Sequence, residues 1–344
     1  MKKLDKAAYV AVNKCMKVKP GERVLIVADN ASKEIGMAIR SAALAITEKV
    51  RFFNIDLPSY GGRPIKSMPQ SLKDAIKECT VSFFVAEACE GELETLRGPY
   101  LQLVVQKARH AHMVGLNMKI METGICVDYD EVSRITKKVF DIVSKASEIK
   151  VTSPAGTDIT ATLDTGMKWI PCSGVIDKVG EWDNLPGGEV FTAPKFMTGK
   201  LVVDGTLGDW VGAKHNGKVN YRETPLVINI QNVGSGSYIK DIYCKQSELL
   251  ADFKKYVGEE KCASRVGELG LGTNVFLKEI VNNILQDEKF PTVHVAFGDP
   301  YHEKTGADWL CNHHIDLLMR ECTIVVDGKE IMSKGKYSKE VLSK

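Results

Sequence analysis

The stretch GERVLIVADNASKEIGMAIRSAALAITEKVRFFNIDL, residues 21–57, decides the fold of the first part of the chain. Its first ten residues, GERVLIVADN, begin with a turn signal, continue as an apolar run and end in Asp and Asn. This order is typical of a buried strand leading into a helix cap. A helical pattern follows at 32–50, and a second strand-like run occupies 50–57. This order of elements predicts parallel strands joined by a crossover helix.

The same alternation continues beyond residue 57. Helical patterns at 70–79, 98–111 and 128–146 are interleaved with strand-like runs at 80–88 and 112–118. We therefore predict an α/β domain at 1–147, with a parallel sheet flanked by helices on both faces. The domain lacks a G-x-G-x-x-G fingerprint, so its pattern is no evidence for a dinucleotide cofactor.

The pattern changes after residue 147. Short β-like runs punctuated by Gly and Asp-Gly predict antiparallel hairpins. Helical patterns recur at 247–257 and 274–288, and further strands are expected at 290–298, 313–319 and 322–332. We predict an α+β domain at 148–344, and we expect it to carry the metal-binding and catalytic residues described below.

Composition limits the classes of function. A chain of 344 residues suits two domains, and 44% apolar and 26% charged residues are typical of a globular protein. A net charge of +2 gives no reason to expect nucleic acid or an anionic membrane as partner. No run approaches the roughly 18 apolar residues of a membrane span, and charged residues interrupt the N-terminal segment where a signal peptide would be apolar. We expect a cytoplasmic protein.

The chain contains nine cysteines and no C-x-x-C pair. An odd number without paired spacing is typical neither of a disulfide framework nor of a zinc finger. We predict free thiols in a reducing compartment, most of them small buried side chains, and Cys311 is expected to be a packing residue.

Four of the seven histidines, His294, His302, His313 and His314, lie within residues 294–314. Side chains alternate along a strand, so His314 and Asp316 share one face of the predicted strand HHIDLL. If the strand around His294 pairs with it, the three side chains converge on a metal ion, and zinc or a two-histidine, one-carboxylate iron site fits equally well. The alternative is that each histidine is structural; His302 and His313 are expected to be surface or supporting groups.

Two glutamates stand in glycine-rich contexts. Glu189 follows a Pro-Gly-Gly turn in GGEVFTAP, and Glu268 lies between glycines in RVGELGLG. Glycine lets the backbone approach a ligand closely. Taken singly, each glutamate is better explained as a turn carboxylate in water.

Four motifs, GGEVFTAP, RVGELGLG, HVAFGDPY and HHID, follow one another at spacings that resemble those of the M29 metallo-aminopeptidases, the aminopeptidase T group of thermophiles. The opening VKPGERVLIVAD is also similar to the first strand of that family, and the resemblance covers nearly the whole chain. It implies six metal-site positions: Glu189, Glu268, His294, Tyr301, His314 and Asp316.

The resemblance implies an aminopeptidase that releases N-terminal residues from small peptides. Three carboxylates, two imidazoles and a tyrosine suit two divalent ions, zinc, cobalt or manganese, about 3.5–4 Å apart with a bridging water. Glu268 is expected to bridge the ions or accept the proton of that water. Tyr301 is expected to coordinate a metal or donate to the oxyanion. By analogy with the family, a homodimer is expected.

Two other functions remain open. The first is a mononuclear iron ring-cleaving enzyme that resembles the dihydroxypyridine dioxygenases of the same fold family and uses His294, His314 and Asp316, or a shifted triad. The second is a metal-stabilised binding protein without turnover. Glu189 and Glu268 favour the aminopeptidase, because a single iron would leave these two carboxylates without a task.

Overall fold

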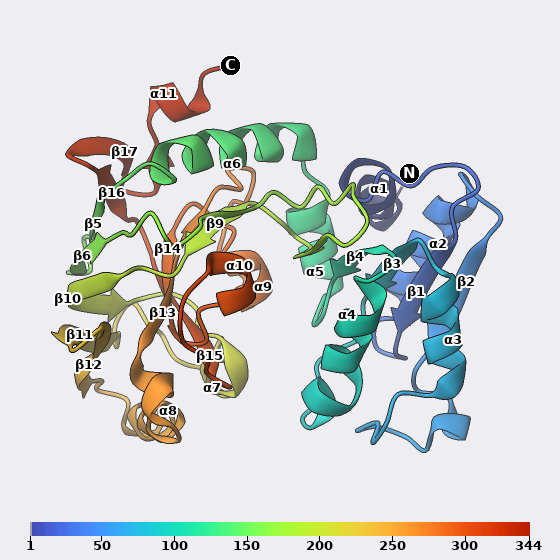
Figure 1. Cartoon of the computed structure of the whole chain (residues 1–344), viewed down its shortest axis with the longest axis horizontal. Coiled ribbons are helices and arrows are strands. Elements are labelled where there is room, and N and C mark those ends of the chain that lie inside the picture. Colours follow the sequence, from blue (N-terminus) through green and yellow to red (C-terminus); the bar gives the residue numbers. More distant parts are fainter. Residues whose placement is uncertain (1) are drawn as a thin grey trace. The chain divides into compact units, whose positions relative to one another are not determined.

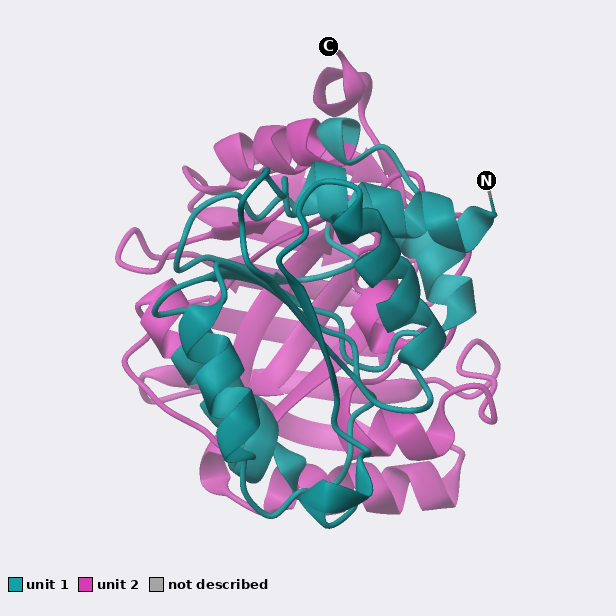
Figure 2. Ribbon diagram, turned by 90° about the vertical axis from the view of Figure 1, so that its right-hand side faces the viewer, with its two compact units in different colours: residues 1–131, 174–187 teal, residues 132–173, 188–344 magenta. Residues whose placement is uncertain are grey.

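The computed structural model describes residues 2–344 and contains two compact units, which Figures 1 and 2 show. Unit 1 comprises Met1–Glu131 and Gly174–Gly187, and unit 2 comprises Val132–Ser173 and Gly188–Lys344. Helix α6, Tyr129–Val143, begins in unit 1 and continues in unit 2. The predicted domain limits, 1–147 and 148–344, stay a prediction, because compactness alone does not show which segment folds by itself.

Unit 1 is built on a five-stranded parallel sheet with the strand order β2-β1-β3-β4-β8. The strands are β1 Val24–Ala28, β2 Val50–Asn54, β3 Val81–Phe84, β4 Arg109–His112 and β8 Trp182–Asn184. Segment 174–187 belongs to this unit because β8 pairs with β4. The strand expected at 112–118 lies earlier, at Arg109–His112.

Helices cover both faces of this sheet, as its continuous apolar strands require. The regular helices are α1 Lys3–Val10, α2 Lys33–Leu44, α3 Gln70–Glu78, α4 Gly98–Val104 and α5 Met118–Ile120. Leu25 and Val27 pack with the residues of α3 and α4 in one core cluster. On the opposite face, Gly36 of α2 lies against Phe52 and Ala28. This arrangement confirms the predicted parallel sheet flanked by helices.

Shorter helical turns link these elements. They are the π-helical segments Ala11–Cys15, Leu93–Arg97 and Met121–Ile125 and the 3₁₀ turn Pro58–Tyr60. Within residues 2–344, no helix combines the length and the apolar character needed to cross a membrane.

Unit 2 contains two antiparallel sheets and confirms the predicted α+β class. The larger sheet has the order β12-β11-β10-β6-β5-β16-β17-β18, and the smaller has the order β15-β14-β13-β9-β7. The larger sheet consists of β5 Glu148–Thr152, β6 Asp158–Thr162, β10 Phe196–Val203, β11 Leu226–Val233, β12 Gly236–Tyr243, β16 Thr323–Val326, β17 Lys329–Ser333 and β18 Lys336–Tyr337. The smaller consists of β7 Ile170–Cys172, β9 Glu189–Thr192, β13 Val266–Gly272, β14 Val293–Gly298 and β15 His314–Met319.

The helices of unit 2 are mostly short. They are α7 Asp209–His215, α8 Ser247–Gly258, the 3₁₀ turn Lys261–Ser264, α9 Ile284–Asp287, α10 His302–Thr305 and α11 Lys339–Leu342. The helix predicted at 274–288 is wrong except for its last turn, α9. Asp287 explains the difference, because its carboxylate accepts hydrogen bonds from the backbone of Val281 and Asn283 and holds the segment in a loop.

The smaller sheet of unit 2 has two faces of different character. Residues such as Leu269, Val295 and Leu317 point into the same core as Ile149 and Val151 of the larger sheet. Because side chains alternate along a strand, the residues between them point to the opposite face. That face carries the polar residues of the predicted metal site.

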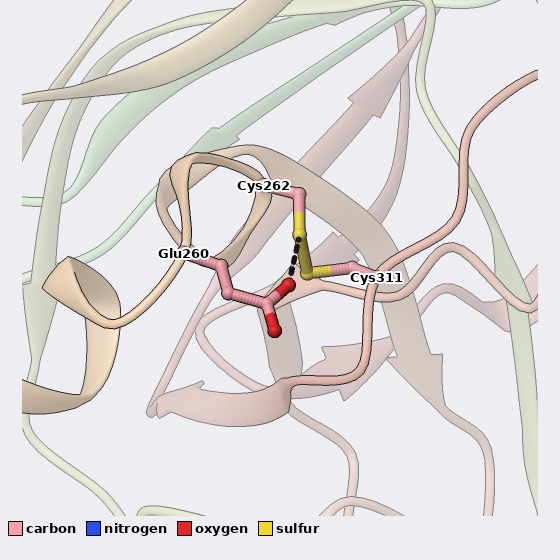
Figure 3. A group of neighbouring side chains, drawn as sticks. All are labelled: Glu260, Cys262 and Cys311. Carbon is pink, nitrogen blue, oxygen red and sulfur yellow. Dashed lines mark hydrogen bonds between the residues drawn. A yellow bond between two sulfur atoms is a disulfide. The ribbon is translucent and has the colours of Figure 1, made fainter.

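The cysteine prediction needs a correction. Cys262 and Cys311, which are 49 positions apart in the sequence, form a disulfide (Figure 3), so Cys311 is not a simple packing residue. The other seven cysteines are free thiols, and most are buried. A carboxylate oxygen of Glu260 lies 3.4 Å from the sulfur of Cys262. The bond joins the turn before β13 to the segment before β15, two strands that carry predicted site residues.

Candidate metal centre

Four neighbouring strands bring the predicted metal ligands together on the polar face of the smaller sheet. Glu268 of β13 and Asp316 of β15 are both in register with Ala296 of β14, which lies between them. His294 lies two residues before Ala296 on β14, opposite Gly270 of β13, and Glu189 is the first residue of β9. Residues far apart in the sequence meet here because the strand register places them side by side.

Glycine creates the space for these side chains. Gly270 of β13 is in register with His294, and a β-carbon added at Gly270 would lie 1.9 Å from the Nε2 atom of His294. The imidazole therefore leans across the neighbouring strand where a side chain would otherwise stand. The glycine-rich motif around Glu268 thus has a steric role that allows His294 to reach that glutamate.

The distances define a tight cluster. The Oε1 atom of Glu268 lies 3.0 Å from Nε2 of His294, and its Oε2 atom lies 3.8 Å from Nε2 of His314. Nε2 of His314 is 3.4 Å from Oδ1 of Asp316. One ligand atom each from Glu268, His294 and Asp316 lies within 4.8 Å of the others. Atoms at this spacing suit coordination of one ion.

The backbone orients one of the two imidazoles. Nδ1 of His314 lies 2.9 Å from the carbonyl oxygen of Asp299, so Nδ1 carries the proton and donates it to that carbonyl. In the neutral ring, Nε2 then presents its lone pair toward Asp316 and Glu268. Such a hydrogen bond to the second nitrogen is the usual device by which proteins orient a metal-binding histidine.

The ionisable side chains of the cluster change one another's pKa values. Burial lowers the pKa of His314, but the negative charge of Asp316 outweighs it and raises that pKa to about 10. Burial likewise opposes protonation of His294, yet the hydrogen bond that it donates to the Glu268 carboxylate and the charge of Glu189 raise its pKa to about 9. Burial raises the pKa of Glu268. The carboxylates therefore attract positive charge to this pocket, and without a metal the imidazoles supply it as protons.

Several buried polar atoms fit a bound cation. Among residues 2–344, Oε2 of Glu189 and Oε2 of Glu268 are buried without a hydrogen-bond donor. A carboxylate oxygen left in this way is costly unless another positive group satisfies it. The side chains of His314 and Asp316 retain 19% and 14% exposure, whereas that of His294 retains 1%. The cluster thus fits a divalent ion and is open on the side of His314 and Asp316.

Tyr301 lies beside the cluster in a strained backbone conformation. Its φ of 49° and ψ of 52° are left-handed, which is uncommon for a large residue. The ring centroid lies 4.7 Å from that of His314 and 5.6 Å from that of Phe191. Burial and the nearby charges of Glu268 and Asp316 raise the pKa of Tyr301 well above its ordinary value. The phenol therefore keeps its proton and can act as a hydrogen-bond donor.

Sequence reasoning missed two charged residues of this site, Glu288 and Lys289. Glu288, Glu189 and His294 form a second group whose ligand atoms lie within 4.8 Å of one another. The amino group of Lys289 lies 2.5 Å from a carboxylate oxygen of each glutamate. The sequence feature that could have revealed them is the segment DEKFP, residues 287–291, where three charged residues stand shortly before a buried strand.

His314 is a member of neither group, although it lies 3.4 Å from Asp316, and His302 and His313 lie outside both groups as well. His313 contacts Glu259 at 2.8 Å, and its side chain points to the opposite face from that of His314. His302 begins α10. The expectation that these two histidines are not metal ligands stays a prediction, as do the roles of the six predicted site residues.

Two solved structures share the fold of this chain, in which histidines and carboxylates gather on one sheet of the second unit. The structure of 2,5-dihydroxypyridine dioxygenase from Pseudomonas putida KT2440 matches with a TM-score of 0.73 at 17% identity, covering 100% of both chains. The structure of wild-type AmpT from Thermus thermophilus matches with a TM-score of 0.66 at 15% identity, covering 97% of this chain and 98% of AmpT. Both likenesses show the fold alone.

The sequence comparisons identify the family. The sequence model of the family described as "NicX: 2,5-dihydroxypyridine 5,6-dioxygenase" matches residues 6–339, so the chain belongs to this family. A curated relative, 2,5-dihydroxypyridine 5,6-dioxygenase of Pseudomonas putida KT2440, is 24% identical over 204 residues. That alignment covers 56% of this chain and 55% of the relative, about half the length of each.

Family membership corrects several predictions. The metallo-aminopeptidase activity, the hydrolase class and the peptide substrate are wrong, because the family match and the curated relative both point to a dioxygenase. The M29 resemblance identified the right fold and the wrong member of it. Groups of metal-binding residues are present as expected. The argument that a single iron leaves Glu189 without a task fails, because Glu189 pairs with Lys289.

Proposed function

We propose that this chain is an iron-dependent dioxygenase that opens the ring of a dihydroxypyridine, with 2,5-dihydroxypyridine as the first candidate substrate. The observation that carries this proposal is that ligand atoms of His294 and Asp316 lie within 4.8 Å of each other, with His314 3.4 Å from Asp316, in a chain of the dioxygenase family. Two histidines and one carboxylate are the ligand set of many non-haem iron(II) oxygenases. When bound, iron(II) supplies the chemistry that lets dioxygen react with an aromatic ring.

The ligand residues leave one side of the site accessible. His294 is the deep member, whereas His314 and Asp316 retain some exposure. We infer that a flat ring enters from the side of these two residues. The aromatic ring of Tyr301, 4.7 Å from that of His314, offers a wall for such a ring and a phenol that donates a hydrogen bond to a ring hydroxyl or nitrogen.

Glu268 has the properties of a proton acceptor for this reaction. It is buried, burial raises its pKa, and its Oε2 atom has no hydrogen-bond donor among residues 2–344. A carboxylate in this state is a stronger base than one in water and can take a proton from a substrate hydroxyl within reach. The overall reaction consumes one ring and one dioxygen molecule, breaks one ring bond and leaves both oxygen atoms in the product, so no further oxidant is needed.

The test is an anaerobic reconstitution with iron(II) followed by addition of 2,5-dihydroxypyridine and oxygen. We expect one oxygen molecule consumed for each ring, together with loss of the aromatic absorbance. Asp316→Asn should abolish both signals, whereas Asp308→Asn, at an exposed position of the same segment, should leave them unchanged. Protein that holds one iron per chain and yet consumes no oxygen with dihydroxypyridines would refute the proposal.

A further inference from the structure

Lys289 places a positive charge at the deepest point of the polar cluster. Its side chain is 0% exposed, and its amino group lies 2.5 Å from Oε1 of Glu189 and 2.5 Å from Oε1 of Glu288. Lysine is almost never buried completely, because an ammonium group taken out of water needs close negative partners. Here both partners are themselves nearly buried, with side chains 7% and 11% exposed.

The two glutamates that hold Lys289 are also potential metal ligands. Glu189, Glu288 and His294 form one compact group, and Glu268, His294 and Asp316 form another, with His294 common to both. Two such groups side by side can hold two positive charges, and the single lone pair of an imidazole nitrogen lets His294 serve only one metal ion there. The chain therefore contains the ligands for two positive centres.

Steric exclusion decides what occupies the first group. A divalent ion bound to Glu189 and Glu288 would lie about 2.0–2.2 Å from their oxygens. The nitrogen of Lys289 lies 2.5 Å from one oxygen of each. An ammonium and a metal ion cannot share that volume, and their like charges would repel strongly in a buried site.

We propose that the ammonium of Lys289 takes the place of a second divalent cation, so that this chain holds one metal ion where its ligands would otherwise hold two. Lys289 thereby determines the metal stoichiometry and gives Glu189 and Glu288 their counter-charge. This inference rests on the metal centre of the proposed function, because it assigns the single ion to the centre that contains His294 and Asp316.

The experiment compares two substitutions that remove the same charge. Lys289→Ala removes the charge and opens the space, whereas Lys289→Met removes the charge and keeps most of the volume. Full-length chains are dialysed against manganese(II), and bound manganese is counted by elemental analysis. We expect one ion per chain in the unmodified protein, two in Lys289→Ala and one in Lys289→Met.

Electron paramagnetic resonance gives a readout that is independent of activity. A single manganese ion gives an isolated six-line spectrum, whereas two ions in the adjacent groups would give a spin-coupled signal in Lys289→Ala. If Lys289→Ala does not fold, the unmodified chain at excess manganese still tests the idea, because two coupled ions in it would overturn the proposal.

The outcomes separate this inference from the proposed function. One ion in both the unmodified chain and Lys289→Ala would overturn the role of Lys289 and leave the single-iron centre intact. No ion in the unmodified chain would instead count against the proposed centre. In that case a gain of one ion in Lys289→Ala would still support the exclusion by Lys289, and no gain would overturn it.

Discussion

Two pairs of histidines in this chain have opposite electrostatic character. His110 and His112 lie on β4 of unit 1, where Nε2 of His110 is 3.2 Å from Nδ1 of His112 and Nδ1 of His110 is 3.1 Å from the hydroxyl of Ser82. Burial lowers the pKa of His112 to about 3 and that of His110 well below its ordinary value. In unit 2, carboxylates raise the pKa values of His294 and His314 to about 9 and about 10.

The contrast shows that the partners of a buried histidine, and not its burial, determine its chemistry. The unit 1 pair is surrounded by hydroxyl and aromatic groups, with Tyr100 and Trp182 among the ring contacts. Neutral imidazoles are the stable form there, and a cation would find no counter-charge. The unit 2 pair faces three or more carboxylates, so positive charge is stable there in the form of protons or a metal ion.

The largest expected effect comes from removing one histidine of each pair. His294→Gln should lower iron affinity more than about 100-fold, because it removes a direct ligand whereas loss of a supporting group alone costs 10–100-fold. His112→Gln should leave iron affinity within about twofold. Iron binding is measured by equilibrium dialysis on both variants. A comparable loss in His112→Gln would mean that the two pairs do not differ as argued here.

The contrast between the pairs was only partly readable from the sequence. HHID was read as a metal-binding motif because His314 and Asp316 share a strand face, and the register places them accordingly. RHAH, residues 109–112, supports no such prediction, because it falls where the predicted helix 98–111 meets the predicted strand 112–118. The buried partners that make β4 stable, such as Ser82, are remote in sequence.

Strong local patterns predicted the fold well, and tertiary contacts explain its exceptions. The alternating strands and helices of 21–57 needed no distant information. By contrast, the pairing of β8 with β4 depends on a segment that leaves unit 1 and returns at residue 174. The apolar spacing of 274–288 indicated a helix, but the side chain of Asp287 binds the backbone in a way that no periodicity records.

In the site, too, some features follow from local sequence patterns and others depend on tertiary contacts. The proposed ligands can be named from the sequence because most of them occupy a strand or a glycine-rich motif, whereas the number of metal ions cannot. In our proposal that number depends on whether a lysine or an ion lies between Glu189 and Glu288, and a lysine beside a glutamate in DEKFP is typical of a solvated surface. Only the fold reveals that this lysine is buried.

A smaller effect should follow from filling the space beneath one histidine. In Gly270→Ala, the new methyl group would lie 1.9 Å from Nε2 of His294, so the imidazole must move away from Glu268. We expect iron affinity to fall about 10–100-fold, as for loss of a supporting contact, and stability to fall by about 1–3 kcal/mol.

Gly258→Ala is the matched control, because an added β-carbon there meets nothing within 4 Å. Both variants are compared by iron dialysis and by urea unfolding. Normal iron affinity in Gly270→Ala would show that the position of His294 over β13 is not needed for the metal centre.

The smallest effect, and the most direct comparison of the two pairs, is the pH dependence of the metal-free chain. His112 has a folded-state pKa of about 3 against 6.5 when unfolded. Below pH 6.5 the unfolded chain therefore binds a proton that the folded chain does not, and stability falls by up to about 1.4 kcal/mol per pH unit. His294 has a raised folded-state pKa of about 9, so its contribution is present below pH 6.5 and is lost as the pH rises through 9.

Urea unfolding of the metal-free chain between pH 5 and pH 10 measures both trends at once. His112→Gln should flatten the acid side of the stability profile and leave the alkaline side unchanged, and His294→Gln should do the reverse. If both variants flatten the same side, the two pairs carry the same charge in the folded chain. The difference in their partners would then have no electrostatic consequence, and the acidic pocket around His294 would lose its strongest argument as a site for a cation.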